Sequence, residues 1–164
     1  PPLRLNSRGL GEASVALGFG ILIPLGADAV QRGALAPAPV YAGLTYAFLV
    51  ANILYINQFP DRRADAACGK LHWVARLGAR RARWGYLALA CAAALTLVAA
   101  VTTAHLPTLA LLAAAPLLLS LVAARDLLAF AEQPHRLLRA IKATLAAAFL
   151  HGLVLAGALV LARP

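Results

Sequence analysis

The sequence predicts an all-α membrane protein, a polytopic bundle of about five transmembrane helices, and three observations lead to this fold class. First, 62% of the 164 residues are hydrophobic and only 13% are charged, whereas soluble domains are typically about half apolar and about a quarter charged. Second, the chain contains charge-free stretches long enough to cross a bilayer, which takes roughly 20 residues. Third, the basic residues gather in alternate connections between these stretches.

The charge-free stretches define the predicted elements in order. The longest, residues 84–124, provides two spans because His105 and Pro107 interrupt it, and the other three provide one each. We expect helices because Ala and Leu are good helix formers and because the apolar runs do not alternate as the strands of a barrel would. Pro24 lies inside the first span and predicts a kink there. The five predicted spans are Ala13–Val30, Val40–Ile56, Trp84–Val101, Thr108–Ala124 and Ala143–Leu161.

The basic residues predict the orientation of the bundle. If the N-terminal segment lies in the cytoplasm and the spans alternate, every Lys and Arg except Arg32 and Arg163 falls on the cytoplasmic side. This bias is typical of an inner membrane of the bacterial type. It places the 57–83 connection in the cytoplasm and Pro164 outside. A net charge of +9 distributed in this way indicates a lipid bilayer as the partner and excludes nucleic acid.

The residues that carry chemistry concentrate between Asn57 and Gly78. Asn57, Asp61 and Asp65 are spaced by four residues, so on a helix they drift only about 40° per step and share one side. An amide and two carboxylates form an all-oxygen set, which is what Mg²⁺ prefers together with substrate phosphates. Lys70 and Arg76 follow, and such cations bind phosphate oxygens. The segment is therefore interpreted as a diphosphate site.

Two features leave alternatives open in this segment. Pro60 complicates a continuous helix, because it is interpreted as ending the second span and starting a new inner helix at its first turn. The two carboxylates also lie among seven basic residues of the 57–83 connection, so a solvated loop that neutralises itself is an equal alternative from the spacing alone.

The pattern Asn-x-x-x-Asp-x-x-x-Asp, followed by Gly69-Lys70 and by Arg-Leu-Gly, resembles the second acidic motif of the UbiA-type membrane prenyltransferases. The opening residues 1–12 and the last span, with Ala140 and His151, are similar to the dihydroxynaphthoate polyprenyltransferase branch of menaquinone biosynthesis. The resemblance implies the second half of a nine-helix fold. Residues 1–164 would then form a single transmembrane domain, the C-terminal part of a longer prenyltransferase domain. The absence of any Met agrees with this expectation.

The resemblance also implies a function, namely Mg²⁺-assisted transfer of a prenyl group from a polyprenyl diphosphate to an aromatic acceptor at the inner membrane face. Within it Asn57, Asp61 and Asp65 hold the metal, Lys70 and Arg76 bind the diphosphate, and Asp61, Asp65 and Lys70 are the catalytic residues.

Two departures from the family pattern qualify this expectation. The family's first acidic motif, on an earlier helix, has no counterpart among the six acidic residues of the chain. We therefore expect activity to need the N-terminal half of the fold as a partner. In addition, Leu71-His72-Trp73 stands where the family usually has a basic residue followed by Thr or Asn. The alternative hypothesis is a non-catalytic membrane scaffold or partner subunit that retains the fold.

Three polar residues outside the motif are interpreted separately, and two of them have alternative interpretations. His151 lies in the middle of a span and is either functional or, the favoured interpretation, a neutral link between helices. Asn52 is interpreted as a similar interhelical link. Glu12 either joins the polar cluster of the inner face or only complements the N-terminus of the first helix.

Overall fold

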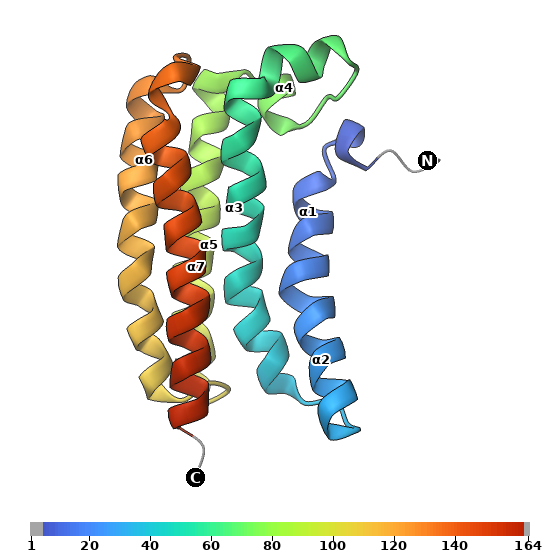
Figure 1. The fold of residues 1–164 in the computed structure, drawn as a ribbon, viewed down its shortest axis with the longest axis vertical. Helices are drawn as coiled ribbons and strands as arrows, with labels where there is room; N and C mark the ends of the chain where they lie inside the picture. Colours follow the sequence, from blue (N-terminus) through green and yellow to red (C-terminus); the bar gives the residue numbers. More distant parts are fainter. Residues whose placement is uncertain (1–4, 163–164) are drawn as a thin grey trace.

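The structure, a computed structural model, describes residues 5–162, and this part of the chain is helical without strands. This part of the chain has five long helices, which run roughly antiparallel with short helices at their ends (Figure 1). The first long helix consists of α1 (Gly11–Val15), η2 (Ala16–Leu22) and α2 (Ile23–Arg32). The others are α3 (Pro37–Ala67), α5 (Ala79–Thr102), η3 with α6 (Thr108–Leu117 and Leu118–Phe130) and α7 (Leu138–Leu161). The short ones are η1 (Asn6–Arg8), α4 (Trp73–Leu77) and η4 (Pro134–Arg136).

The five long helices are each long and apolar enough to cross a membrane, which confirms the predicted fold class and the number of spans. The second is longer than predicted. Pro60 lies inside α3, so it neither ends the span nor begins a separate helix. With 31 residues at about 1.5 Å each, α3 is roughly 46 Å long and exceeds the roughly 30 Å hydrocarbon core. Its last turns therefore project beyond the core and carry the polar segment.

Small side chains form the interior of the bundle. The buried residues of α5 are mostly alanines at helical spacing, and α7 repeats this pattern. Large apolar residues such as Leu95, Phe149 and Leu153 are exposed instead. This arrangement is opposite to that of a soluble protein and typical of membrane helices, because small residues let backbones approach while large ones contact lipid.

Four of the long helices, α3, α5, η3–α6 and α7, pack together as a bundle (Figure 1). The Gly11–Arg32 helix lies to one side and, among the long helices described, contacts only α3. Its middle is wound as a π-helix before Pro24, and the N–H of Ile23 is bonded to the carbonyl of Gly18. This wide turn precedes the proline at the place where the sequence predicts a kink.

Two glycines set the contact between the Gly11–Arg32 helix and α3. A Cβ added to Gly43 would lie 1.8 Å from the carbonyl oxygen of Gly20, and one added to Gly20 would lie 2.1 Å from the Cβ of Ala47. Gly43 and Ala47 are one turn apart on α3, so together they form a small-residue groove of the kind that lets membrane helices approach closely.

Buried polar side chains link the helices of the bundle. His151 of α7 lies 3.2 Å from the Thr45 hydroxyl on α3 and 2.8 Å from the carbonyl of Ala113 in η3. Asn52 of α3 donates to the carbonyl of Tyr86 on α5 at 3.2 Å. Both residues are fully buried. The interpretation of His151 and Asn52 as links between helices is therefore confirmed by their contacts.

Charge separates along the length of the molecule. The ends of α3, α6 and η1 and the starts of α5 and α7 lie together at one end, called here the motif end (top of Figure 1). Every basic residue between positions 5 and 162 belongs to this end except Arg32, which closes α2 at the opposite end. Arg163 and Pro164, which the sequence places on the other side, lie outside the described residues.

Candidate functional site

The site is built on the last turns of α3. Asn57, Asp61 and Asp65 all lie within this one continuous helix, so the predicted shared face exists. The amide nitrogen of Asn57 donates to the carbonyl of Ile53 at 2.8 Å, which fixes the side chain and leaves its amide oxygen for another partner. Asp61 is exposed and, among residues 5–162, makes no hydrogen bond or ion pair. Its carboxylate is therefore accessible from the aqueous side.

Of these three side chains, Asp65 has the most polar contacts. Its Oδ1 accepts a hydrogen bond from the Lys70 ammonium at 3.0 Å, and its Oδ2 lies 3.3 Å from Nε2 of His72. The hydrogen bond and the charge of Asp65 raise the pKa of Lys70 above lysine's ordinary 10.5. Because a raised pKa favours the charged amine, Lys70 remains a cation throughout the neutral range.

A helix-ending turn explains why Lys70 meets Asp65. Gly69 adopts a left-handed conformation with φ of 75°. The N–H of Lys70 bonds to the Asp65 carbonyl at 2.8 Å, and the N–H of Gly69 bonds to the Ala66 carbonyl at 3.1 Å. This pair of bonds is a Schellman motif, in which a glycine ends the helix and the chain folds back over its last turn. The Gly-Lys dipeptide of the sequence motif therefore has a structural role that brings a cation beside a carboxylate.

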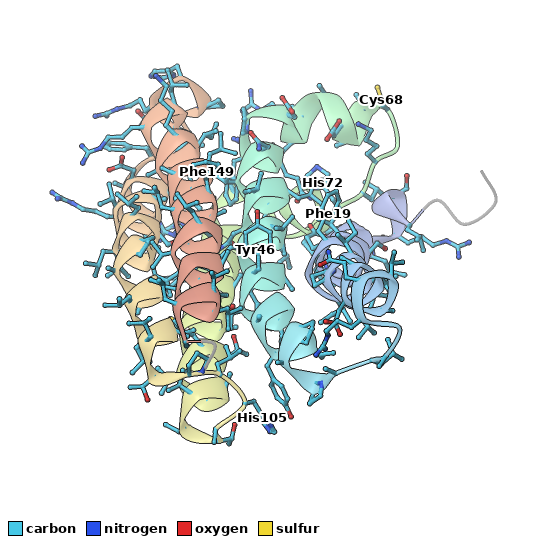
Figure 2. The ribbon with its side chains drawn as sticks, turned by 60° about the horizontal axis from the view of Figure 1, so that its bottom comes forward. Phe19, Tyr46, Cys68, His72, His105 and Phe149 are labelled. Carbon is cyan, nitrogen blue, oxygen red and sulfur yellow. The ribbon has the colours of Figure 1, made fainter. Side chains whose placement is uncertain are left out.

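His72 belongs to this site, although sequence reasoning noticed it only as a departure from the family pattern. Its Nδ1 accepts the backbone N–H of Ala75 at 3.2 Å and so caps α4. That bond assigns the proton of the neutral ring to Nε2, the atom that faces Asp65. The ring is fully buried. Figure 2 shows His72 on the inner side of the α3–α4 connection and Cys68 at its tip. Histidine is not a usual helix cap, so no sequence signal predicted this position.

Arg76 is placed differently from the other predicted residues. It lies on α4, and its guanidinium binds the carbonyls of Leu71 and, at 3.2 Å, of Ser7. These bonds tie α4 to the segment that precedes α1. The structure therefore groups Asn57, Asp61, Asp65 and Lys70 on the end of α3 and sets Arg76 beside them, with its donors used by backbone.

A buried pair lies deeper on the same helix. Nε2 of Gln58 donates to Oε1 of Glu12 at 2.8 Å, and both side chains are more than nine-tenths buried. Gln58 precedes Asp65 by seven residues, which on an α-helix is about 20° short of two full turns. It therefore shares the direction of Asp65. The spacing of seven was the signal that could have identified Gln58, and the contact brings Glu12 into the polar cluster of the motif end.

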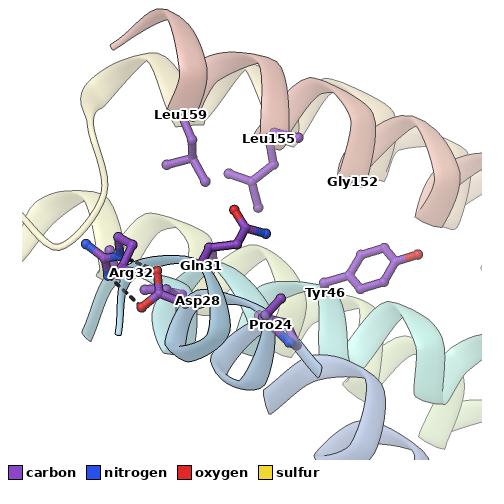
Figure 3. Close-up of a pocket in the computed structure, with 14 residues that line it drawn as sticks. Pro24, Asp28, Gln31, Arg32, Tyr46, Gly152, Leu155 and Leu159 are labelled. Atoms are coloured by element: carbon purple, nitrogen blue, oxygen red, sulfur yellow. Dashed lines mark hydrogen bonds and ion pairs between the residues drawn. The ribbon is translucent and has the colours of Figure 1, made fainter. Parts of the chain in front are cut away.

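A large cavity lies away from these residues. It measures about 850 Å³ and opens between α2, the start of α3 and the end of α7. Figure 3 shows Gln31 pointing into it and the Asp28–Arg32 ion pair, 2.5 Å, at its mouth. Since Asp28 and Arg32 end the first long helix while the acidic motif ends α3, the cavity belongs to the opposite half of the bundle and is not part of the motif site.

Fold and site together define a class of protein, a polytopic helical membrane protein with an oxygen-rich, cation-flanked site at one end of its bundle. The family model of the UbiA prenyltransferase family matches residues 1–139, and the chain belongs to this family. None of the curated proteins and none of the solved structures compared with the chain matches it. Family membership supports membrane prenyltransferase activity in general.

Proposed function

We propose that this chain forms part of a membrane enzyme that transfers a prenyl group from a polyprenyl diphosphate to an aromatic acceptor. The observation that carries the proposal is the placement of Asp61 and Asp65 one turn apart at the projecting end of α3, with the Lys70 ammonium 3.0 Å from Asp65. Carboxylates, a cation and an adjoining apolar bundle are the parts that an amphiphilic diphosphate substrate requires. Membership of the UbiA family supports the same reaction class.

The residues fit a divalent cation that is shared with the substrate. Within residues 5–162, no three His, Cys, Asp or Glu side chains gather closely enough to hold a metal by themselves. Asn57, Asp61 and Asp65 nevertheless offer hard oxygen atoms on one face, and Mg²⁺ is usually bound by one or two carboxylates plus substrate phosphates. These three residues would hold it. When bound, the ion would neutralise charge on the departing diphosphate.

The chain's own residues contribute positioning and charge. Lys70 is half-exposed, so its ammonium can reach a phosphate oxygen while Asp65 orients its stem. Nε2 of His72 lies 3.3 Å from the opposite oxygen of Asp65 and makes no hydrogen bond within residues 5–162, so it lies beside that carboxylate on the α4 side. Arg76, once released from the carbonyls that it binds, would supply a second cation. Cations arranged around a leaving diphosphate stabilise the charge that develops as the C–O bond breaks.

The apolar bundle supports the second part of the reaction. Ionisation of the C–O bond leaves an allylic cation, which an electron-rich aromatic ring then attacks. Ile56 and Phe59, which precede Asp61 by five and two residues on α3, are fully buried, so the surroundings of this helix turn apolar within about one turn of the motif. A site that excludes water protects such a cation from hydrolysis.

We further propose an inner-membrane location with the motif end in the cytoplasm, and an acceptor of the quinone-precursor type. The first is supported by the basic residues at the motif end, which are typical of cytoplasmic connections. The second is supported by residues 1–12 and by the last span, which resemble the menaquinone branch.

A non-catalytic scaffold is the second candidate. It is favoured by one observation, that both Asp65 oxygens already face Lys70 and His72, as a self-neutralised connection would require. The two candidates differ in the coding sequence upstream of Pro1. An in-frame Asn-Asp-x-x-Asp on an apolar helix supports the enzyme, and a complete gene without it supports the scaffold.

The decisive experiment replaces the carboxylates in the complete gene product that contains this chain. Asp61→Asn and Asp65→Asn should each lower turnover at least about 100-fold, on the order of 3 kcal/mol of transition-state stabilisation. Raising Mg²⁺ should partly restore it, because mass action offsets weaker binding. Turnover is measured against Mg²⁺ concentration in matched membranes.

Glu132→Gln is the matched control, since Glu132 is an exposed acid of the same end. Asp126 is less suitable because it pairs with Arg139 at 3.5 Å and links α6 to α7. Wild-type turnover in both Asn variants at equal protein level would contradict the proposed function.

A further inference from the structure

The Glu12–Gln58 pair has two oxygen atoms without a partner. Oε2 of Glu12 and Oε1 of Gln58 are buried and, within residues 5–162, accept no hydrogen bond. The side chains are 8% and 4% exposed. Buried acceptors without donors are unfavourable, so a bonded pair that leaves one such oxygen on each residue indicates a ligand with hydrogen-bond donors.

The position of the pair separates it from the acidic motif. Gln58 precedes Asp61 by three residues, so it lies about 4.5 Å deeper along α3, and about 10.5 Å deeper than Asp65. The pair is also covered by a second helix, because Glu12 comes from the first turn of α1, which packs on α3. A group bound there would lie below the exposed Asp61, on the apolar side of the site.

The chemistry of the pair excludes the diphosphate as its ligand. An ionised diphosphate offers only acceptor oxygens, and a carboxylate repels its charge. A hydroxyl group has the opposite character, because it carries a donor hydrogen and no charge. Two neighbouring acceptors, one of them a carboxylate, therefore suit a neutral molecule with one or two hydroxyl groups.

We propose that Glu12 and Gln58 bind the hydroxyl groups of the aromatic acceptor and hold its ring beside the prenyl diphosphate. This inference rests on the proposed function and deepens it, since it assigns two residues of this chain to the acceptor. Gln58 positions the Glu12 carboxylate through the 2.8 Å bond between them, and Oε2 of Glu12, which has no partner within residues 5–162, would accept from the ligand.

The test is equilibrium binding to the detergent-solubilised complete gene product, which requires no turnover. The two probes are naphthohydroquinone, kept anaerobic, and its dimethyl ether, which has the same ring without donor hydrogens. The wild type should prefer the diol by about 10-fold, the ratio expected for one hydrogen bond to a charged acceptor. Glu12→Gln should abolish most of this preference because it removes the charge, and Gln58→Met should also lower it. Glu132→Gln makes the same chemical change at an exposed acid of the same end and should leave the preference unchanged.

Three results would overturn the inference. The first is an equal loss of diol and ether affinity in Glu12→Gln, which indicates a structural pair satisfied by water. The second is a wild type that binds both probes equally. The third is recovery of diol binding in Glu12→Gln when Mg²⁺ is raised, which indicates a metal-binding pair. Prenyl transfer by the wild type is assayed separately, so failure of the proposed function is recognised independently of this binding result.

Discussion

At the scale of single residues, Asp65 organises the motif end. Its two carboxylate oxygens face Lys70 and His72, and its backbone carbonyl accepts the N–H of Lys70. The sequence predicts the alignment of Asn57, Asp61 and Asp65, because a spacing of four alone determines it once the segment is helical. It could not predict the His72 contact, which depends on how α4 folds back, nor the bonds that hold Arg76 on backbone carbonyls.

The first residue-scale prediction concerns Gly69, whose left-handed backbone ends α3. Gly69→Ala should destabilise the protein by about 1 kcal/mol, because a Cβ is disfavoured at positive φ. The measurement is the thermal unfolding midpoint in detergent. Gly69→Asn is the matched variant, since Asn tolerates this conformation better, and it should lie between wild type and Ala. An Ala variant as stable as wild type would show that the turn is not formed.

The same residue tests the link from backbone to substrate binding. In Gly69→Ala the turn that carries Lys70 is disturbed, so affinity for inorganic diphosphate should fall even in the fraction that remains folded. A fall would show that the position of Lys70 relative to Asp65 determines diphosphate binding. Unchanged diphosphate affinity in a destabilised variant would show that the turn serves stability and not diphosphate binding.

At the scale of elements, α3 shows where sequence reasoning succeeded and where it failed. The apolar stretch of α3 predicts a span. The interpretation of Pro60 as the end of that span is wrong, because the helix continues through it. Helix propensity describes an isolated helix. In the folded chain, Ile56 and Phe59 lie just before the proline, are fully buried and hold the backbone in place. Tertiary packing thus overrides the local signal, which is a common reason for errors in helix ends.

The element-scale prediction uses two glycines of the Gly11–Arg32 helix, Gly18 and Gly20. A Cβ at Gly20 would meet α3 at 2.1 Å, whereas one at Gly18 would meet nothing within 4 Å. Gly20→Ala should therefore destabilise by about 1–3 kcal/mol, as overpacking of a tight contact does, and Gly18→Ala should leave stability unchanged. Unfolding of both variants in mixed detergent micelles provides the comparison. Similar unfolding of the two would mean that this helix does not pack on α3 through Gly20.

At the scale of the whole molecule, the sequence predicted five spans and the gathering of basic residues at one end, and the structure has both. The reason is that hydropathy and charge are summed over many residues and do not depend on detailed packing. The placement of the Gly11–Arg32 helix against α3 alone was not predicted, because it follows from a few small residues such as Gly20 and Gly43.

The whole-molecule prediction concerns orientation, and Cys68 is a native reporter for it. Cys68 is exposed at the motif end, while Cys91 is exposed in the middle of α5. In a Cys91→Ser background, a membrane-impermeant thiol reagent should modify Cys68 only after the cells are permeabilised.

The control for this experiment is Ala34→Cys in a background lacking both native cysteines. Ala34 is exposed in the connection between α2 and α3 at the opposite end, so it should react in intact cells. Reaction of Cys68 from outside intact cells would reverse the proposed orientation.

The contact between the Gly11–Arg32 helix and α3 has a consequence for biosynthesis. Among the long helices of residues 5–162, this helix contacts only the next span in the chain. The pair can therefore associate in the bilayer as soon as α3 has left the ribosome, before α5, α6 and α7 are translated. Closing the bundle is different, because α3 also packs on α7, which is synthesised after α5 and α6. Within this part of the chain, the two-helix unit should thus form before α3 and α7 close the bundle.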